Sequence, residues 1–154
     1  MSAARLLQAA RDKGVRIAAA ESCTGGLIMA ALTDIAGSSD VVDRGFVTYS
    51  NAAKYEMLGV RPATLDQHGA VSEQVATEMA QGALVRSDAG LAVAVTGIAG
   101  PGGSEFKPEG RVCFGLASAE GTRTETVEFG AIGRAEVRRA TVAHALDMML
   151  HALQ

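Results

Sequence analysis

Ser22 is the residue in this sequence with the clearest potential for covalent chemistry. It lies in the run Glu21-Ser22-Cys23-Thr24-Gly25-Gly26, between an expected strand and an expected helix. A hydroxyl at such a junction lies beside unpaired backbone N–H groups at the positive end of a helix, which can stabilise a developing oxyanion. The pattern therefore allows a serine nucleophile, and also the simpler alternative of a serine that only caps the helix.

A serine hydroxyl needs a base, and the three histidines offer no obvious one. His144 and His151 share the expected last helix and are typical of structural or solvated side chains, while His68 lies in an expected loop with no assigned role. Lysine is the other route, because a desolvated ammonium can lose its proton near neutral pH. Of the three lysines, Lys54 is the best candidate, since it follows the expected strand end Tyr49-Ser50-Asn51 by one helical turn.

Two features could bind an anion. The glycine-rich segment 96–103 would let a backbone approach phosphate or ribose closely, although a plain flexible connection explains it equally well. It matches neither a Walker A loop nor the Gly-x-Gly-x-x-Gly pattern. Arg134, Arg138 and Arg139 could supply a phosphate fork, or they could simply form a charged helix face.

Cys23, beside the serine, is the second candidate for the nucleophile, although buried cysteines are usually inert. The acidic residues Asp34, Asp40 and Asp43 are scattered around an expected loop without a histidine partner. We therefore expect neither a metal site nor a cofactor.

The composition bounds the class of protein. With 154 residues and 48% hydrophobic content, the chain fits one domain with a substantial core. The formal net charge of −3 gives no general attraction for a polyanion, so no stable nucleic-acid binding is expected. No apolar stretch reaches the roughly 20 residues that cross a bilayer, and the two cysteines form no disulfide framework, so a soluble cytoplasmic protein is expected. Surplus apolar helix faces favour a homo-oligomer.

Helix and strand patterns alternate along the chain, which favours an α/β fold, specifically a single three-layer α/β/α domain with a mixed sheet. The expected helices cover residues 2–13, 27–35, 51–58, 72–86 and 134–153. The expected strands cover residues 15–20, 41–50, 91–95, 111–119 and 122–129. Ser2, Asn51 and Ser72 are expected N-caps, and Glu120-Gly121 is compatible with a hairpin turn that makes the last two strands antiparallel.

Together these motifs resemble one family, the C-terminal domain of the competence/damage-inducible protein CinA, which also occurs as stand-alone nicotinamide mononucleotide deamidases of the PncC type. Any one motif is weak, but their order and separations are specific, and they cover nearly the whole chain. The matching segments are Ala20-Glu21-Ser22-Cys23-Thr24-Gly25-Gly26, Val47-Thr48-Tyr49-Ser50-Asn51 with Lys54, Leu58-Gly59-Val60, Gly69-Ala70-Val71-Ser72, Thr96-Gly97-Ile98-Ala99-Gly100-Pro101-Gly102-Gly103, and Lys107-Pro108.

The resemblance implies one α/β/α amidohydrolase domain over residues 1–154, which converts the small-molecule substrate nicotinamide mononucleotide to nicotinic acid mononucleotide and ammonia. It implies that Ser22 is the nucleophile and Lys54 its base, and that Tyr49 assists proton transfer or orientation. Arg138 is favoured for the substrate phosphate, with Arg134 second. The expected substrate-binding residues are Cys23, Thr24, Gly25, Gly26, Thr96, Gly97, Gly100, Gly102, Arg134 and Arg138.

The sequence departs from the family pattern at one position, and two alternative functions remain open. Glu109 follows Lys107-Pro108 where the family pattern has valine, which could alter closure of the loop. The first alternative is a noncatalytic module that senses a nucleotide or binds a partner linked to competence or DNA damage. The second is an amidase or esterase for another pyridine or small amide, which would not need a phosphate site.

Overall fold

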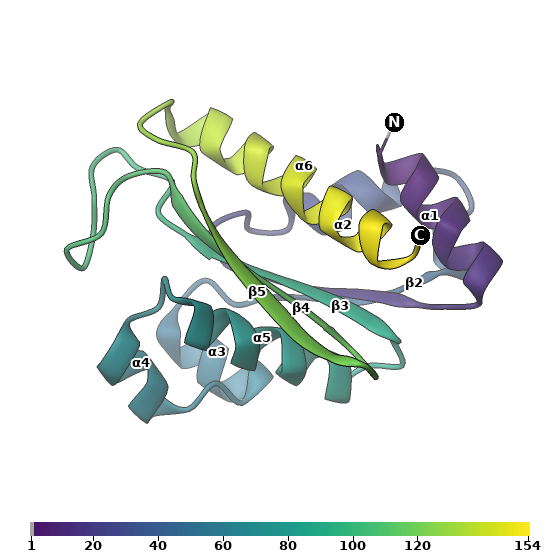
Figure 1. Cartoon of the computed structure of the whole chain (residues 1–154), viewed down its shortest axis with the longest axis horizontal. Coiled ribbons are helices and arrows are strands. Elements are labelled where there is room, and N and C mark those ends of the chain that lie inside the picture. The colour runs from purple at the N-terminus through teal and green to yellow at the C-terminus, as the bar shows by residue number, and fades with distance from the viewer. Residues whose placement is uncertain (1) are drawn as a thin grey trace.

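A five-stranded mixed sheet forms the middle layer of the molecule (Figure 1). The structure is a computed structural model that describes residues 2–154, except for the side chain of Ser2. In the strand order β2-β1-β3-β4-β5, the first three strands are parallel and the last two are antiparallel to their neighbours. The strands are β1 (Ile17–Glu21), β2 (Val42–Val47), β3 (Leu91–Gly97), β4 (Arg111–Ser118) and β5 (Gly121–Glu128).

Helices cover both faces of this sheet, with three on each side (Figure 1). One layer holds α1 (Ser2–Lys13), α2 (Leu27–Thr33) and α6 (Arg134–Ala152). The other holds α3 (Asn51–Leu58), α4 (Pro62–His68) and α5 (Glu73–Val85), and a short 3₁₀ turn, η1 (Ser38–Asp40), precedes β2. The expected three-layer α/β/α arrangement is confirmed. No helix in this described part of the chain is long and apolar enough to span a bilayer.

The two faces of the sheet have different packing. On the face of α1 and α6 the core contains large side chains such as Leu6, Phe114 and Met149. On the face of α5 the strands present mainly alanines, so this helix lies close to the sheet. At Gly115 of β4 an added Cβ would lie 2.5 Å from the Ala76 carbonyl oxygen, so the close approach requires glycine there.

The expected elements are present, and one helix is additional. The helix α4 was not expected because its seven residues are too few for an apolar period, although proline at its first turn is a typical start. His68, expected in a loop, is therefore the last residue of α4. The expected strand 41–50 ends already at Val47. The cap expected from the Ser2 side chain lies outside the described part of the structure.

Two local expectations were wrong by one residue. Ser50, and not Asn51, is the N-cap of α3, because its hydroxyl accepts a hydrogen bond from the Ala53 N–H at 3.0 Å. The hairpin turn consists of residues 119–120, since Gly121 already pairs with the opposite strand.

The fold brings three connections to one edge of the sheet. Because β1, β2 and β3 are parallel, the segments after their carboxyl ends meet at that edge. The Ser22 N–H donates to the Val95 carbonyl at 3.2 Å, and the Thr48 N–H donates to the Glu21 carbonyl at 2.7 Å. Residues 21–22, 48 and 95 are therefore held side by side, although they are far apart in sequence.

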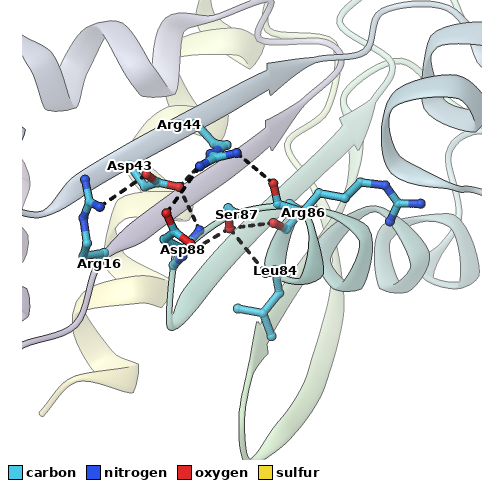
Figure 2. A network of polar contacts seen from close by, with 9 residues as sticks. Arg16, Asp43, Arg44, Leu84, Arg86, Ser87 and Asp88 are labelled. Atoms are coloured by element: carbon cyan, nitrogen blue, oxygen red, sulfur yellow. Dashed lines mark hydrogen bonds and ion pairs between the residues drawn. The ribbon is translucent and has the colours of Figure 1, made fainter.

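A polar network fixes the opposite, amino-terminal edge of the parallel strands, as Figure 2 shows. The Asp43 carboxylate accepts hydrogen bonds from Arg44 Nε at 2.7 Å and from the Asp88 N–H at 3.0 Å, and it lies 3.4 Å from Arg16 Nη1. These contacts lower the pKa of Asp43, chiefly because the Asp88 N–H donates to the charged form. The network joins β2 to the segment between α5 and β3.

Candidate active site

Ser22 and Lys54 are in direct contact at the carboxyl edge of the sheet. Ser22 follows β1, Lys54 lies within α3, and Lys54 Nζ is 2.9 Å from Ser22 Oγ. Lys54 is only 2% exposed and Ser22 only 7%. The structure thus brings together the two residues that the sequence predicts as base and nucleophile, across a separation of 32 residues.

The partners of Lys54 Nζ suit a neutral amine. Besides the serine, Nζ lies 3.0 Å from the Thr48 carbonyl oxygen and 3.4 Å from that of Tyr49. These two carbonyls can only accept hydrogen bonds, and a neutral amine has two N–H donors and one lone pair. When the two N–H groups donate to the carbonyls, the lone pair is left to face Ser22 Oγ.

Burial shifts the titration of Lys54 in the direction that a base requires. Desolvation lowers the pKa of Lys54 below its ordinary value of 10.5, while Cys23 and Glu105 oppose this shift by Coulombic attraction. The lowered pKa increases the fraction of neutral amine near neutral pH. The site therefore has a hydroxyl and a deprotonatable amine in hydrogen-bond contact, the arrangement that activates a serine.

Glu21 is a buried carboxylate that the sequence interpretation left without a role. Its Oε1 accepts hydrogen bonds from Thr24 Oγ1 at 2.5 Å, from the Gly26 N–H at 3.1 Å and from the Ile28 N–H at 2.9 Å. Its Oε2 accepts from the Met29 N–H at 3.1 Å. An acidic residue just before a short helix is the signal that could have indicated this, because a carboxylate stabilises a helix N-terminus.

Glu21 limits which backbone amides can serve an oxyanion site. It accepts hydrogen bonds from the N–H groups of Gly26, Ile28 and Met29, so these three amides at the start of α2 are already paired. Within the described structure, the N–H groups of Cys23 and Thr24 donate to no backbone carbonyl. These two amides follow the serine directly and are the donors that remain for a developing negative charge.

A cavity of about 390 Å³ opens over the serine and lysine. The glycine-rich loop 97–103 forms much of its wall. Of the sequence-predicted residues, the cavity wall includes Ser22, Cys23, Tyr49, Lys54, Thr96, Gly97, Gly100, Gly102 and Arg134. It does not include Thr24, Gly25, Gly26 or Arg138, which lie behind the nucleophile turn or against Glu21.

The two candidate phosphate ligands lie in different places. Arg138 donates from Nε and Nη2 to the two carbonyls of the 23–24 turn, at 3.0 and 3.2 Å. Arg134 lies on the cavity wall and donates from Nη1 to the Gly100 carbonyl at 2.6 Å and from Nη2 to the Tyr49 hydroxyl at 3.0 Å. Both guanidiniums donate to protein acceptors, and of the two arginines only Arg134 lies on the cavity wall.

Thr96, expected to bind the substrate, lies on the cavity wall but is almost completely buried. Its hydroxyl donates to the Ala70 carbonyl at 2.8 Å and so joins β3 to the segment that precedes α5. The arrangement gives Thr96 a structural contact, with its remaining lone pairs beside the cavity.

The other candidate groups are less suited to nucleophilic chemistry. Burial raises the pKa of the Cys23 thiol to about 11, so this thiol is neutral near pH 7. His144 packs on Phe114 with ring centroids 4.5 Å apart, and its Nε2 lies 2.5 Å from Glu125 Oε1. None of the three histidines lies on the cavity wall. Among residues 2–154, no group of three or more His, Cys, Asp or Glu side chains could hold a metal ion.

A buried lysine in contact with a serine, beside a glycine-lined cavity in an α/β fold, is compatible with the chemistry of a hydrolase. Comparison with known proteins defines the family. The chain belongs to the CinA C-terminal domain family, whose model matches residues 1–153.

Named relatives agree with this membership. The chain is 52% identical over 143 residues to the Escherichia coli K12 protein named nicotinamide-nucleotide amidohydrolase PncC, covering 92% of this chain and 87% of that one. It is 60% identical over 121 residues to a CinA-like protein of Chlorobium phaeobacteroides, covering 76% of this chain but only 29% of that longer protein. The crystal structure of the competence/damage inducible protein CihA from Agrobacterium tumefaciens matches with a TM-score of 0.94 and 55% identity, covering 99% and 93% of the two chains.

Proposed function

We propose that this chain hydrolyses the carboxamide of nicotinamide mononucleotide, giving nicotinic acid mononucleotide and ammonia. The observation that carries the proposal is the 2.9 Å contact between Lys54 Nζ and Ser22 Oγ inside a glycine-lined cavity. The 52% identity to a nicotinamide-nucleotide amidohydrolase supports the choice of substrate. The alternative of a noncatalytic module gives no reason for burying a lysine against a serine.

In the first half of the reaction, neutral Lys54 takes the proton of Ser22 Oγ while Oγ attacks the carboxamide carbon. The amides of the 23–24 turn donate to the oxyanion that forms. Lys54 then delivers its proton to the leaving nitrogen, the C–N bond breaks, and ammonia departs. An ester between Ser22 and the nucleotide remains.

In the second half, Lys54 takes a proton from water, and the resulting hydroxide attacks the ester carbon. The bond to Ser22 Oγ breaks, and Lys54 returns the proton to that oxygen. The products are nicotinic acid mononucleotide and the starting enzyme, so protons and bonds balance without a metal or cofactor.

Substrate binding is assigned to the rim of the cavity. Arg134, exposed and already oriented by Gly100 and Tyr49, is the proposed ligand of the substrate phosphate. Arg138 is proposed to act indirectly, by holding the carbonyls of the 23–24 turn so that its amides point toward the oxyanion. Tyr49 is proposed to orient Arg134 through its hydroxyl.

Ammonia release from three compounds tests this function. We expect turnover of nicotinamide mononucleotide, weaker turnover of nicotinamide riboside and the weakest of free nicotinamide, because only the first has a phosphate. Ser22→Ala should lower kcat by at least about a hundredfold, while Ser39→Ala, an exposed serine in η1, should not. Nucleotide binding without ammonia release would favour the noncatalytic module, and equal rates on all three compounds would reject the phosphate site.

We further propose that residues 1–154 act as one cytoplasmic amidohydrolase domain in a homo-oligomer that binds no nucleic acid stably. An apolar cavity between α2 and α6, with Leu27, Ala31 and Val142 in its wall, supports an oligomer by offering a surface for another copy. Light scattering after size-exclusion chromatography measures the oligomeric state, and a monomer at micromolar concentration would contradict it.

A further inference from the structure

The carboxylate of Glu109 lies against the glycine-rich loop, although Glu109 is not on the cavity wall. Its Oε1 accepts a hydrogen bond from the Gly102 N–H at 2.7 Å. An added Cβ at Gly100 would lie 2.6 Å from Glu109 Cδ, so the side chain packs directly on the Gly100 backbone. Gly100 and Gly102 have φ values of +90° and +83°, which only glycine adopts easily.

The same loop is fixed differently at its base and at its tip. At the base, the Gly110 N–H donates to the Ile98 carbonyl at 2.7 Å, as in a continuing strand pair. At the tip, glycines give the backbone many accessible conformations, so a single conformation requires a specific restraint. The hydrogen bond from the Gly102 N–H to Glu109 supplies that restraint.

This restraint extends to the substrate-binding rim. The Gly100 carbonyl accepts a hydrogen bond from Arg134 Nη1 at 2.6 Å, and Arg134 Nη2 donates to the Tyr49 hydroxyl at 3.0 Å. The orientation of the Arg134 guanidinium therefore depends on where the loop places the Gly100 carbonyl. The Glu109 side chain packs on this same residue, Gly100.

We propose that Glu109 is a positioning residue that sets affinity for the nucleotide phosphate by fixing loop 100–103 and, through Gly100, the Arg134 guanidinium. This inference rests on the proposed function. Glu109 acts as a hydrogen-bond acceptor for Gly102, and its negative charge is not required. It touches neither the reacting carboxamide nor the nucleophile, so it influences substrate binding and not the chemical step.

Two substitutions separate the acceptor from the charge. Glu109→Gln keeps an oxygen that can accept from Gly102, whereas Glu109→Val removes this acceptor and introduces the residue of the family pattern. We expect Glu109→Val to raise KM for nicotinamide mononucleotide about fivefold or more with kcat within about twofold, as for the loss of one hydrogen bond. Glu109→Gln should stay within about twofold in both constants, like the control Glu120→Gln in the β4–β5 turn. KM for nicotinamide riboside should not change.

The proposal is overturned if Glu109→Val leaves KM unchanged, if it lowers kcat as strongly as it raises KM, or if Glu109→Gln is impaired to the same extent. An amide exchange measurement by NMR keeps the test separate from the proposed function. The Gly102 N–H should be protected in the wild type and in Glu109→Gln and should exchange at least about tenfold faster in Glu109→Val. If neither the wild type nor any variant releases ammonia, the exchange rate of the Gly102 N–H and the affinity for nicotinic acid mononucleotide still decide the role of Glu109.

Discussion

Lys54 is a buried amine whose three hydrogen-bond partners fit the neutral form as well as the charged one. Thr48 and Tyr49 offer carbonyl oxygens only, and Ser22 offers a hydroxyl that can donate or accept. Desolvation favours the neutral amine. At this scale the site is therefore a proton acceptor aimed at one hydroxyl.

The pH dependence of the reaction follows from Lys54. Because the pKa of Lys54 is lowered and the neutral amine is the base, kcat/KM should rise with pH toward that pKa and fall as the ammonium forms at lower pH. Ammonia release is best measured above about pH 7, where the substrate phosphate, with a second pKa of about 6, is already ionised. A kcat/KM that decreases as pH rises from 7 to 9 would contradict this role.

At the scale of elements, the turn between β1 and α2 is organised around Glu21. This carboxylate is completely buried and accepts four hydrogen bonds, three of them from backbone N–H groups. It thereby fixes where α2 begins, and the amides of the 23–24 turn donate to no backbone carbonyl. The helix start and the candidate oxyanion site thus depend on one side chain.

Substitution of Glu21 tests this dependence. Glu21→Ala leaves the N–H groups of α2 and the Thr24 hydroxyl without their acceptor, so we expect the free energy of unfolding to fall by about 2–4 kcal/mol. Urea denaturation followed by circular dichroism measures the change, with Glu120→Gln as an exposed control. A loss below about 0.5 kcal/mol would show that water replaces the carboxylate without cost.

At the scale of the whole molecule, the carboxyl and amino-terminal edges of the parallel strands carry different groups of residues. The carboxyl edge carries the cavity, and the amino-terminal edge carries the network of Arg16, Asp43, Arg44 and Asp88 (Figure 2). The sheet lies between them, so a change in the network should alter stability without altering the geometry around the serine.

Asp43→Asn should therefore lower stability and leave kcat within about twofold of the wild type. The folded-state pKa of Asp43 is depressed below 3.8, so its contribution is present above the unfolded pKa and disappears as pH falls through the folded pKa. The difference in unfolding free energy between wild type and variant should be largest near pH 7 and smallest near pH 2. A difference that is independent of pH would contradict the role of the ionised carboxylate.

Much of this arrangement could be predicted from the sequence, because strand and helix patterns alternate clearly and the motif residues appear in a specific order. The short distance between the Ser22 and Lys54 side chains could not be predicted, because it depends on the pairing of β1 with β2 and on the start of α3. The positions of Arg134 and Arg138 relative to the cavity could not be predicted for a similar reason. The two arginines are one helical turn apart, and only the packing of α6 determines which one reaches the cavity.

The role of Glu21 and of Glu109 was also beyond the sequence interpretation. Both are carboxylates that accept backbone N–H groups from a neighbouring turn or loop. Such contacts depend on the exact path of a glycine-containing backbone, which local propensity does not specify. The departure at Glu109 was visible, but its partner Gly102 was not.

The central claim, that Lys54 activates Ser22 for covalent attack on a carboxamide, is tested most directly by rapid-quench mass spectrometry. Enzyme mixed with excess nicotinamide mononucleotide and quenched in acid should release a burst of one ammonia per site, with the acyl group of the nucleotide attached to Ser22 itself, as located by peptide fragmentation. Lys54→Met should show neither the burst nor the adduct. A burst in which the acyl group is already free acid, or is attached to Cys23, would contradict the account.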